Sequence, residues 1–161
     1  MTAVMNPAEW EERVIVKRSE NTKRAQNGVD LTVYKIMRHK SPAYLYEDKS
    51  KIVHSEKEEV KPDESGMIYL EPGVYEIWFG EVVEIPPGAS GFILQRSTLS
   101  RNGVFIRSAW YDSGFRGRAE ALMIVGNPVY IELGMRVAQL ILFESDEAEL
   151  YNGTYKDQDV D

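Results

Sequence analysis

The sequence predicts a mostly β fold with little helix, a distorted jelly roll in the form of a barrel or sandwich. Short apolar runs recur along the second half of the chain, and β-branched and aromatic residues dominate them. Pro and Gly turns separate these runs at a spacing of roughly 8–12 residues, which is typical of antiparallel strands. A doubly wound α/β fold would need a helix between successive strands, and the chain leaves no room for one.

The expected elements follow in chain order within one domain, residues 1–161. A short polar N-terminal segment includes a helix around Pro7–Val14, and a turn at residues 27–28 enters a strand. The polar region Lys40–Ser65 is expected to form loops around a weak strand near Tyr44–Tyr46. Eight apolar runs predict strands at Met67–Leu70, Val74–Phe79, Val82–Ile85, Gly91–Leu94, Val104–Ile106, Ala119–Val125, Val129–Ile131 and Val137–Phe143. From about residue 150 we expect a flexible tail.

Composition narrows the classes of function. The net charge of -7 argues against general nucleic-acid binding, because a polyanion prefers a basic face. A small polyphosphate stays compatible, since a few local cations can hold it. No apolar run approaches the ~20 residues of a membrane span, so we expect no membrane partner. Cysteine is absent, which excludes disulfides and thiolate metal sites and makes a cytoplasmic location the default.

The segment Gln95–Gly103 places two arginines around three hydroxyl residues. Arg96 and Arg101 supply planar, charged donors that suit phosphate oxygens, and Ser97 and Thr98 can converge on the same anion. The alternative is a helix start, in which Ser97 or Thr98 caps the helix and Leu99 packs inward.

The segment Ser108–Gly117 predicts a tight hairpin. A carboxylate at its edge, Asp112, could orient and deprotonate a water near a bound phosphate, and Phe115 could pack on a sugar or base. The alternative is a plain turn, in which Asp112 bonds to the backbone.

Two further segments carry polar residues beside strands. Gln139 interrupts the apolar run Val137–Phe143, and it is either a ligand contact or a residue that faces solvent by alternation. Asp30 follows the turn at residues 27–28 and could be a simple turn residue.

In this order the four segments resemble the motifs of the trimeric dUTPase and dCTP deaminase superfamily, on its archaeal, deaminase-like branch. The matching stretches are Gly28-Val29-Asp30-Leu31, Arg96-Ser97-Thr98-Leu99-Ser100-Arg101, Asp112-Ser113-Gly114-Phe115-Arg116-Gly117 and Gly134-Met135-Arg136-Val137-Ala138-Gln139-Leu140. The C-terminal stretch Tyr151–Gln158 resembles the tail of that branch, although Thr154 stands where a phosphate-contacting Lys is usual.

The resemblance implies a dUTPase-like jelly-roll subunit, a homotrimer with shared active sites, and a deoxynucleotide substrate with Mg2+ bound mainly through the triphosphate. It implies that Asp112 activates a water for attack on the α-phosphorus of dUTP, giving dUMP and pyrophosphate. The further roles it implies are phosphate binding by Arg96, Ser97, Thr98, Arg101 and Gln139, pyrimidine binding along Ser108, Ala109, Trp110 and Tyr111, sugar packing by Phe115, a tail contribution from Tyr151, Lys156 and Gln158, and contact of Asp30 with the water shell of Mg2+.

A dCTP deaminase is the main alternative, because deaminases of this family carry a Glu ten positions after the hairpin Asp. Here that position is Leu122, which cannot transfer a proton, and the nearest acid is Glu120. Alternation puts both side chains on one face, roughly 6–7 Å apart, so Glu120 could replace the missing Glu only through a bulge or a register shift. Leu122 therefore favours dUTP diphosphatase activity. The same motifs would also suit a trimer that binds deoxynucleotides without hydrolysis, and the strands alone would suit a plain β-sandwich interaction domain.

Overall fold

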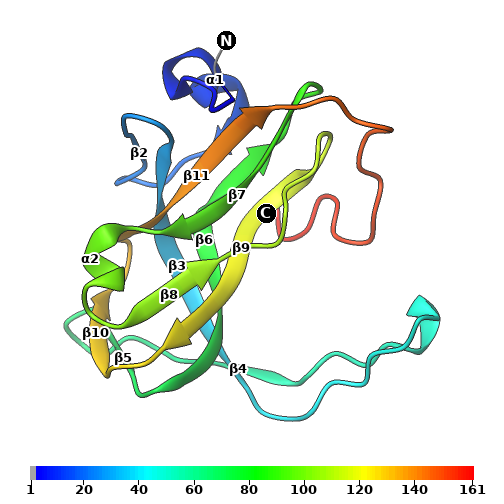
Figure 1. Cartoon of the computed structure of the whole chain (residues 1–161). Helices are drawn as coiled ribbons and strands as arrows, with labels where there is room; N and C mark the ends of the chain where they lie inside the picture. The colour runs from blue at the N-terminus through cyan, green and yellow to red at the C-terminus, as the bar shows by residue number, and fades with distance from the viewer. Residues whose placement is uncertain (1–2) are drawn as a thin grey trace.

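Six antiparallel strands close into a barrel in the computed structural model, which describes residues 3–161 (Figure 1). The first two residues of the expected domain lie outside this range. The ring runs in the order β6 (Gly73–Glu84), β9 (Arg116–Val125), β8 (Val104–Arg107), β7 (Ala89–Gln95), β11 (Arg136–Glu144) and β3 (Val29–His39), and β3 pairs back with β6. This confirms the mostly β fold.

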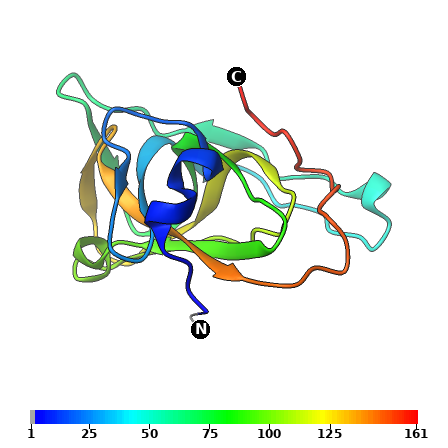
Figure 2. The ribbon, with the colours of Figure 1, turned by 90° about the horizontal axis from the view of Figure 1, so that it is seen from above.

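The remaining elements decorate the barrel. They are α1 (Pro7–Val14), β1 (Ile15–Lys17), β2 (Lys23–Arg24), the 3-10 helix η1 (Lys49–Lys51), β4 (Lys57–Glu59), α2 (Ser97–Ser100) and a separate two-stranded sheet of β5 (Met67–Leu70) and β10 (Val129–Glu132). Seen from above, α1 lies over one end of the barrel (Figure 2). The side chain of Asn6 caps α1 by accepting the Ala8 N–H at 3.0 Å. Within the described chain, no helix has the length and apolar character needed to cross a membrane.

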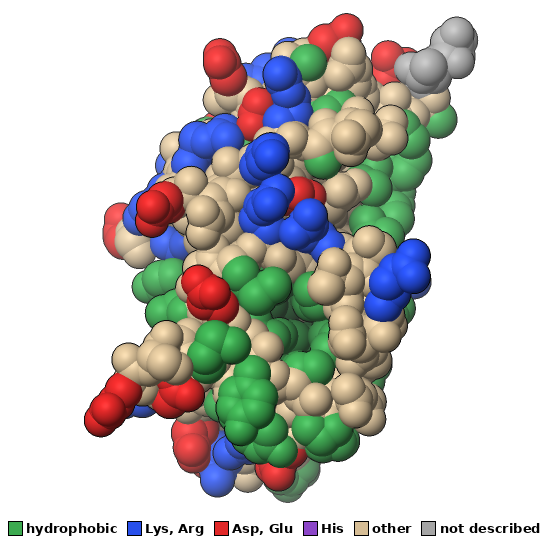
Figure 3. All heavy atoms as spheres, turned by 90° about the vertical axis from the view of Figure 1, so that its left-hand side faces the viewer, with side chains coloured by type: hydrophobic (Ala, Val, Ile, Leu, Met, Phe, Trp, Pro, Cys, Tyr) green, Lys and Arg blue, Asp and Glu red, His purple; other side chains and the backbone are tan. Residues whose placement is uncertain are grey.

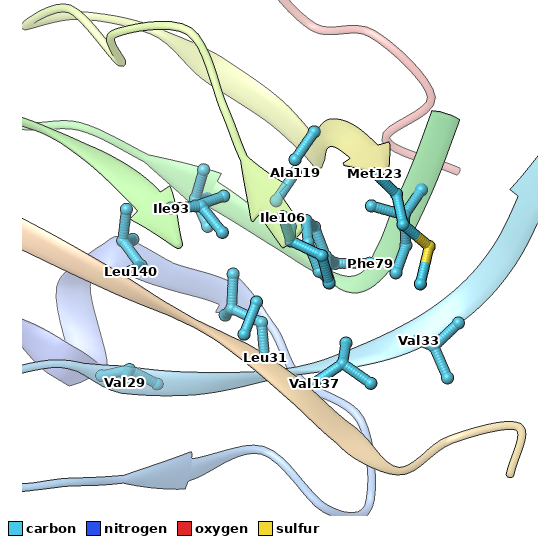
Figure 4. Close-up of a cluster of buried hydrophobic side chains, with 14 of the residues drawn as sticks. Val29, Leu31, Val33, Phe79, Ile93, Ile106, Ala119, Met123, Val137 and Leu140 are labelled. Carbon is cyan, nitrogen blue, oxygen red and sulfur yellow. The ribbon is translucent and has the colours of Figure 1, made fainter. Parts of the chain in front are cut away.

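The core fills the barrel with side chains from alternate strand positions. In β9, Ala119, Ala121 and Met123 point inward, whereas Leu122 and Ile124 are exposed on the outer face. Figure 4 shows Ala119 and Met123 in the same buried cluster as Leu31 of β3 and Leu140 of β11. The alternation fixes which residues remain available on the outside.

Two expectations about strands need correction. The runs Val74–Phe79 and Val82–Ile85 form one strand, β6, whose register with β9 shifts between Trp78 and Val82. The sequence suggests that Gly80 ends a strand, but Gly80 lies in a bulge, and β6 pairs with β9 on both sides of it. The stretch Tyr44–Tyr46 forms no strand and makes only an isolated bridge between Tyr44 and Val53. The helix Pro7–Val14 and the other six runs are confirmed.

Candidate functional site

A positively charged pocket, here called the cation pocket, lies where β2, β3, β11 and the start of α2 meet. Its volume is about 460 Å³, and Figure 3 shows Lys and Arg side chains gathered on this face of the molecule. The lining residues are Lys23, Arg24, Ala25, Gln26, Asp30, Leu94, Gln95, Arg96, Ser97, Arg136 and Gln139. Four cations and one carboxylate therefore share a pocket in a chain of net charge -7. This charge balance suits a polyanionic ligand.

The buried carboxylate of Asp30 organises this pocket. Its Oδ1 accepts a hydrogen bond from Gln139 Nε2 at 3.2 Å, and its Oδ2 accepts one from Arg136 Nη1 at 3.3 Å. Arg96 Nε lies 3.5 Å from the same Oδ2. One carboxylate thus aligns two guanidinium groups and one amide that lie on β11 and at the start of α2.

Gly28 allows the close strand approach that this arrangement needs. A Cβ at Gly28 would lie 2.5 Å from the Leu140 carbonyl oxygen and 2.9 Å from Gln139 Cγ. Since real Cβ atoms do not approach a backbone atom so closely, any other residue would push β3 away from β11 and displace Asp30 from Gln139.

For the segment Gln95–Gly103 the alternative is a helix start, and the short helix α2 confirms part of it. Leu99 packs inward and is buried, but the cap position is Arg96, which makes no side-chain cap bond. The hydroxyls of Ser97 and Thr98 are therefore not used as caps. Ser97 lines the cation pocket, whereas Thr98 and Arg101 are exposed outside it.

A second hollow, here called the hairpin pocket, lies between the hairpin and the C-terminal segment, with a volume of about 720 Å³. Its lining includes Trp110, Asp112 and Tyr151 of the predicted site residues. The Asp112 carboxylate is exposed and accepts no hydrogen bond from any residue in the range 3–161, so the backbone bond of the plain-turn alternative is not formed. The turn is held instead by the Asp112 carbonyl, which accepts the Phe115 N–H at 3.1 Å.

The two strands of this hairpin separate before they reach its tip. β8 and β9 pair from Val104 and Val125 to Arg107 and Leu122. Beyond that point Ser108 and Tyr111 bond to β7, through Ile93 and Gly91, whereas β9 stays with β6. The backbone groups of Ala109 and Trp110 have no hydrogen-bond partner in the described part of the chain. The gap leaves this main chain free to bind the edge of a planar ring.

Aromatic rings pack on both sides of this gap. Trp110 is half-exposed and stacks on Phe92 and Phe143, with ring centroids 5.7 and 5.8 Å apart. Phe115 is buried, because Tyr111 and the tail residue Tyr151 pack their ring edges against it at 5.0 and 5.5 Å. The predicted sugar-packing residue is therefore covered by the protein's own tail.

The tail follows the hairpin closely. The Tyr151 N–H donates to the Ser113 carbonyl at 2.7 Å, and the Arg118 N–H donates to the Gln158 carbonyl at 2.8 Å. Asp157 pairs with Arg116 at 2.8 Å. Lys156 is exposed, and neither it nor Gln158 lines either pocket.

Two titratable groups in the gap have shifted pKa values. Burial and, to a smaller extent, the Glu76 charge raise the pKa of the Glu120 carboxyl to about 7, although the Lys57 charge opposes the shift. Burial also raises the pKa of the Tyr111 phenol well above its usual value. A large share of Glu120 and all of Tyr111 are therefore neutral near pH 7.

The cation pocket contains three cations that the sequence does not predict as site residues. Arg136 belongs to a quoted motif, and its position close to Gln139 is the signal that could have identified it. Lys23 and Arg24 enter because β2 folds back on β3 in the register Lys23 to Asp30 and Arg24 to Val29. A two-residue strand leaves no periodic pattern, so no sequence signal marks them.

The acidic side chains near the cation pocket determine how the protein could bind a divalent cation. In residues 3–161, no cluster of three or more His, Asp or Glu side chains could enclose a metal ion. The Asp30 carboxylate already contacts Arg96, Arg136 and Gln139. Asp30 is the one carboxylate among the described residues that line this pocket, and a single carboxylate can contact a divalent cation but not enclose it.

Comparisons with known proteins agree with this geometry. A family model described as dCTP deaminase-like matches residues 7–145. A protein of Aeropyrum pernix named probable deoxyuridine 5'-triphosphate nucleotidohydrolase is 36% identical over 146 residues, which cover 88% of this chain and 90% of that protein.

Two solved structures share the fold. The 2'-deoxycytidine 5'-triphosphate deaminase of Agrobacterium tumefaciens matches with a TM-score of 0.65 and 16% identity over 89% of this chain, which spans 49% of that deaminase chain. The EIAV dUTPase matches with a TM-score of 0.52 and 17% identity, over 87% of this chain and 98% of the other.

Proposed function

The chain belongs to the dCTP deaminase-like family, and we propose that within it this protein hydrolyses dUTP to dUMP and pyrophosphate. The observation that carries the proposal is the free, exposed carboxylate of Asp112 beside a gap whose backbone at Ala109 and Trp110 is unpaired within residues 3–161. The name of the Aeropyrum pernix relative supports the choice of substrate.

In the proposed reaction Asp112 orients a water and accepts its proton as the oxygen attacks the α-phosphorus. A new P–O bond forms to the water oxygen, the bond to the bridging oxygen breaks, and pyrophosphate leaves with those electrons. An exposed carboxylate without other partners in the described chain suits this role, since no donor there competes for its lone pairs.

The cation pocket holds the triphosphate. Asp30 aligns Arg96, Arg136 and Gln139, and Ser97 places beside them a hydroxyl that has no hydrogen-bond partner within residues 3–161. Charge-assisted bonds from preorganised arginines favour phosphate oxygens. Mg2+ would be chelated by the triphosphate and lower the charge that repels the nucleophile, with Asp30 reaching its water shell. Thr98 and Arg101 complete this set only where a neighbouring chain brings a phosphate to them.

A homotrimer with shared sites is supported by the separation of the two pockets. The cation pocket is lined mainly from β2, β3, β11 and the start of α2, and the hairpin pocket mainly from the hairpin and the segment after β11, so they have no lining residue in common. We infer that a dUTP molecule that reaches both Asp112 and the arginines takes them from different copies of the chain. The outward-facing aromatic residues Phe92, Trp110 and Phe143 give such a copy an apolar surface to bury.

The test is kinetic. Purified protein with Mg2+ should release pyrophosphate from dUTP, and Asp112→Asn should lower kcat about 10²- to 10⁴-fold while dUMP still binds. Asp146→Asn, which also lines the hairpin pocket, is the matched control and should keep normal turnover. Near-normal turnover of Asp112→Asn would remove Asp112 from this role.

The same preparation distinguishes hydrolysis from deamination and from binding alone. The register of β9 with β6 is regular from Glu120 to Val125, and the shift between Glu120 and Arg118 places its extra residues on β6. β9 carries no extra residue there that would bring Glu120 to the position of Leu122. Ammonia release from dCTP would nevertheless establish deamination. Tight dUTP binding without pyrophosphate release would instead establish a non-hydrolysing deoxynucleotide-binding protein.

A further inference from the structure

A buried carboxylate outside the predicted site, Glu81, lies in the bulge of β6 and is 0% exposed. Its Oε1 accepts the Thr32 backbone N–H at 3.0 Å. Its Oε2 accepts hydrogen bonds from the hydroxyls of Thr32 at 2.9 Å, Ser19 at 3.1 Å and Thr22. No cation of the described chain lies within ion-pair distance of it. Four donors therefore offset the cost of burying this group.

These bonds fasten one particular turn to the barrel. Ser19 and Thr22 belong to the connection between β1 and β2, and the Ser19 N–H also donates to Thr22 Oγ1 at 2.8 Å. Thr32 lies on β3, two residues after Asp30, and its hydroxyl is 2.6 Å from that of Ser19. Glu81 thus ties the turn to the strand that carries the carboxylate of the cation pocket.

The turn leads directly into Lys23 and Arg24. Both line the cation pocket, both are exposed, and neither is within ion-pair distance of any carboxylate in residues 3–161. Asp30 instead contacts Arg96 and Arg136. Lys23 and Arg24 are consequently two uncompensated positive charges at the edge of a pocket that suits phosphate.

We propose that Lys23 and Arg24 bind the polyphosphate part of the substrate, and that Glu81 is the positioning residue that holds them there through Ser19 and Thr22. The identity of the ligand rests on the proposed dUTP hydrolysis; the anion site itself rests on these contacts. Glu81 touches no ligand, and its effect reaches the pocket through the turn.

The chemistry at Oε2 explains why a carboxylate is needed. Three hydroxyls surround this atom within hydrogen-bond distance, and those of Ser19 and Thr32 also contact each other at 2.6 Å. In Glu81→Gln, the Thr32 N–H keeps the amide oxygen at Oε1, so the amide nitrogen must replace Oε2. The amide nitrogen carries two N–H donors and no acceptor, so at most two of the three hydroxyls could turn and accept from it, and the turn would lose at least one of its attachments.

The experiment measures dUTP kinetics and direct binding of inorganic tripolyphosphate to the intact protein by calorimetry. Lys23→Ala and Arg24→Ala should each raise KM and weaken tripolyphosphate binding about 3- to 10-fold, with kcat within about twofold. Lys17→Ala, which removes an exposed cation of β1 outside the pocket, is the matched control and should change neither.

Thr22→Val and Glu81→Gln test the positioning role. Both should raise KM about 3- to 10-fold without removing any cation of the pocket. Thr22→Val is isosteric and partly exposed, so it answers the question even where Glu81→Gln does not fold. In the Lys23→Ala/Arg24→Ala background, Thr22→Val should have no further effect on KM, because its effect passes through those two residues.

Several results would overturn the proposal. Unchanged tripolyphosphate binding in Lys23→Ala and Arg24→Ala removes the two cations from the site. An equal, additive KM effect of Thr22→Val in both backgrounds reduces Glu81 to general stability. Failure of the proposed function looks different: wild-type protein then releases no pyrophosphate from dUTP, while tripolyphosphate binding and its loss in Lys23→Ala are still measured.

Discussion

The hydroxyl of Tyr111 bridges the backbone of Glu120 across the open hairpin, accepting its N–H at 2.9 Å and donating to its carbonyl at 3.0 Å. The two residues lie on chain segments that have already separated, so this side chain replaces a missing pair of strand hydrogen bonds. The buried phenol therefore closes the inner end of the gap in which we expect the nucleobase to lie.

Tyr111→Phe should lower the free energy of unfolding by about 1–3 kcal/mol, because it leaves both Glu120 backbone groups without their partner. Urea denaturation at fixed protein concentration measures the change. Tyr155→Phe, at an exposed tail position, serves as the control. A Tyr111→Phe protein as stable as the control would mean that water replaces the phenol.

Stability should fall as the pH rises from about 4.5 to about 7 because of Glu120. Its folded pKa of about 7 lies above the usual value of 4.5, so the folded state holds a proton that the unfolded state has lost. Ionising the buried group then costs about 1–3 kcal/mol, a cost that is absent below about pH 4.5 and complete above about pH 7. Glu120→Gln should flatten this part of the pH profile, whereas parallel profiles for the two proteins would contradict the assignment.

Asp30→Asn should weaken pyrophosphate binding about 10-fold even without Mg2+, because the neutral amide no longer aligns Arg96 and Arg136. Calorimetry in the presence of EDTA measures this directly. Weakening that appears only when Mg2+ is added would instead give Asp30 a role confined to the water shell of the metal.

The Arg118 amide should exchange slowly with deuterium in the intact chain, because the Gln158 carbonyl accepts its hydrogen. Ending the chain at Tyr155 should speed that exchange, while the amide of Ile93, which bonds to Ser108 Oγ in the barrel, keeps its protection. Equal exchange at Arg118 in both proteins would show that the tail leaves the hairpin in solution.

The sequence predicts those parts of the fold in which apolar and polar residues alternate along a strand. The run Ala119–Val125 alternates between core and surface, and the structure keeps that alternation in β9. The bulge in β6 is not readable, because Gly80 and Glu81 look like a break until the four donors around the buried carboxylate are known. A pattern of neighbouring residues cannot show that Glu81 bonds to residues 49 to 62 positions away in the sequence.

The residues of the candidate site could be predicted where they belong to a motif, but not where distant parts of the chain bring them together. Motif resemblance places Arg96, Ser97, Gln139 and Asp30 in one set, and the structure brings these four into one pocket. The roles of Lys23 and Arg24 depend on how a two-residue strand pairs with β3. The covering of Phe115 by Tyr151 depends on a tail that returns to the hairpin from a distant part of the sequence.

The contact between Gly117 and Gln158 has a consequence for the behaviour of the chain in concentrated solution. Where β8 leaves β9, a strand edge would otherwise lie open, and open edges recruit foreign strands. Gln158 pairs both polar backbone groups of Arg118, through its own carbonyl and its side-chain amide at 3.0 Å. Tyr111 does the same for Glu120. The protein thus masks this edge with its own side chains, which guards it against aggregation by strand addition while leaving the facing main chain of Ala109 and Trp110 free.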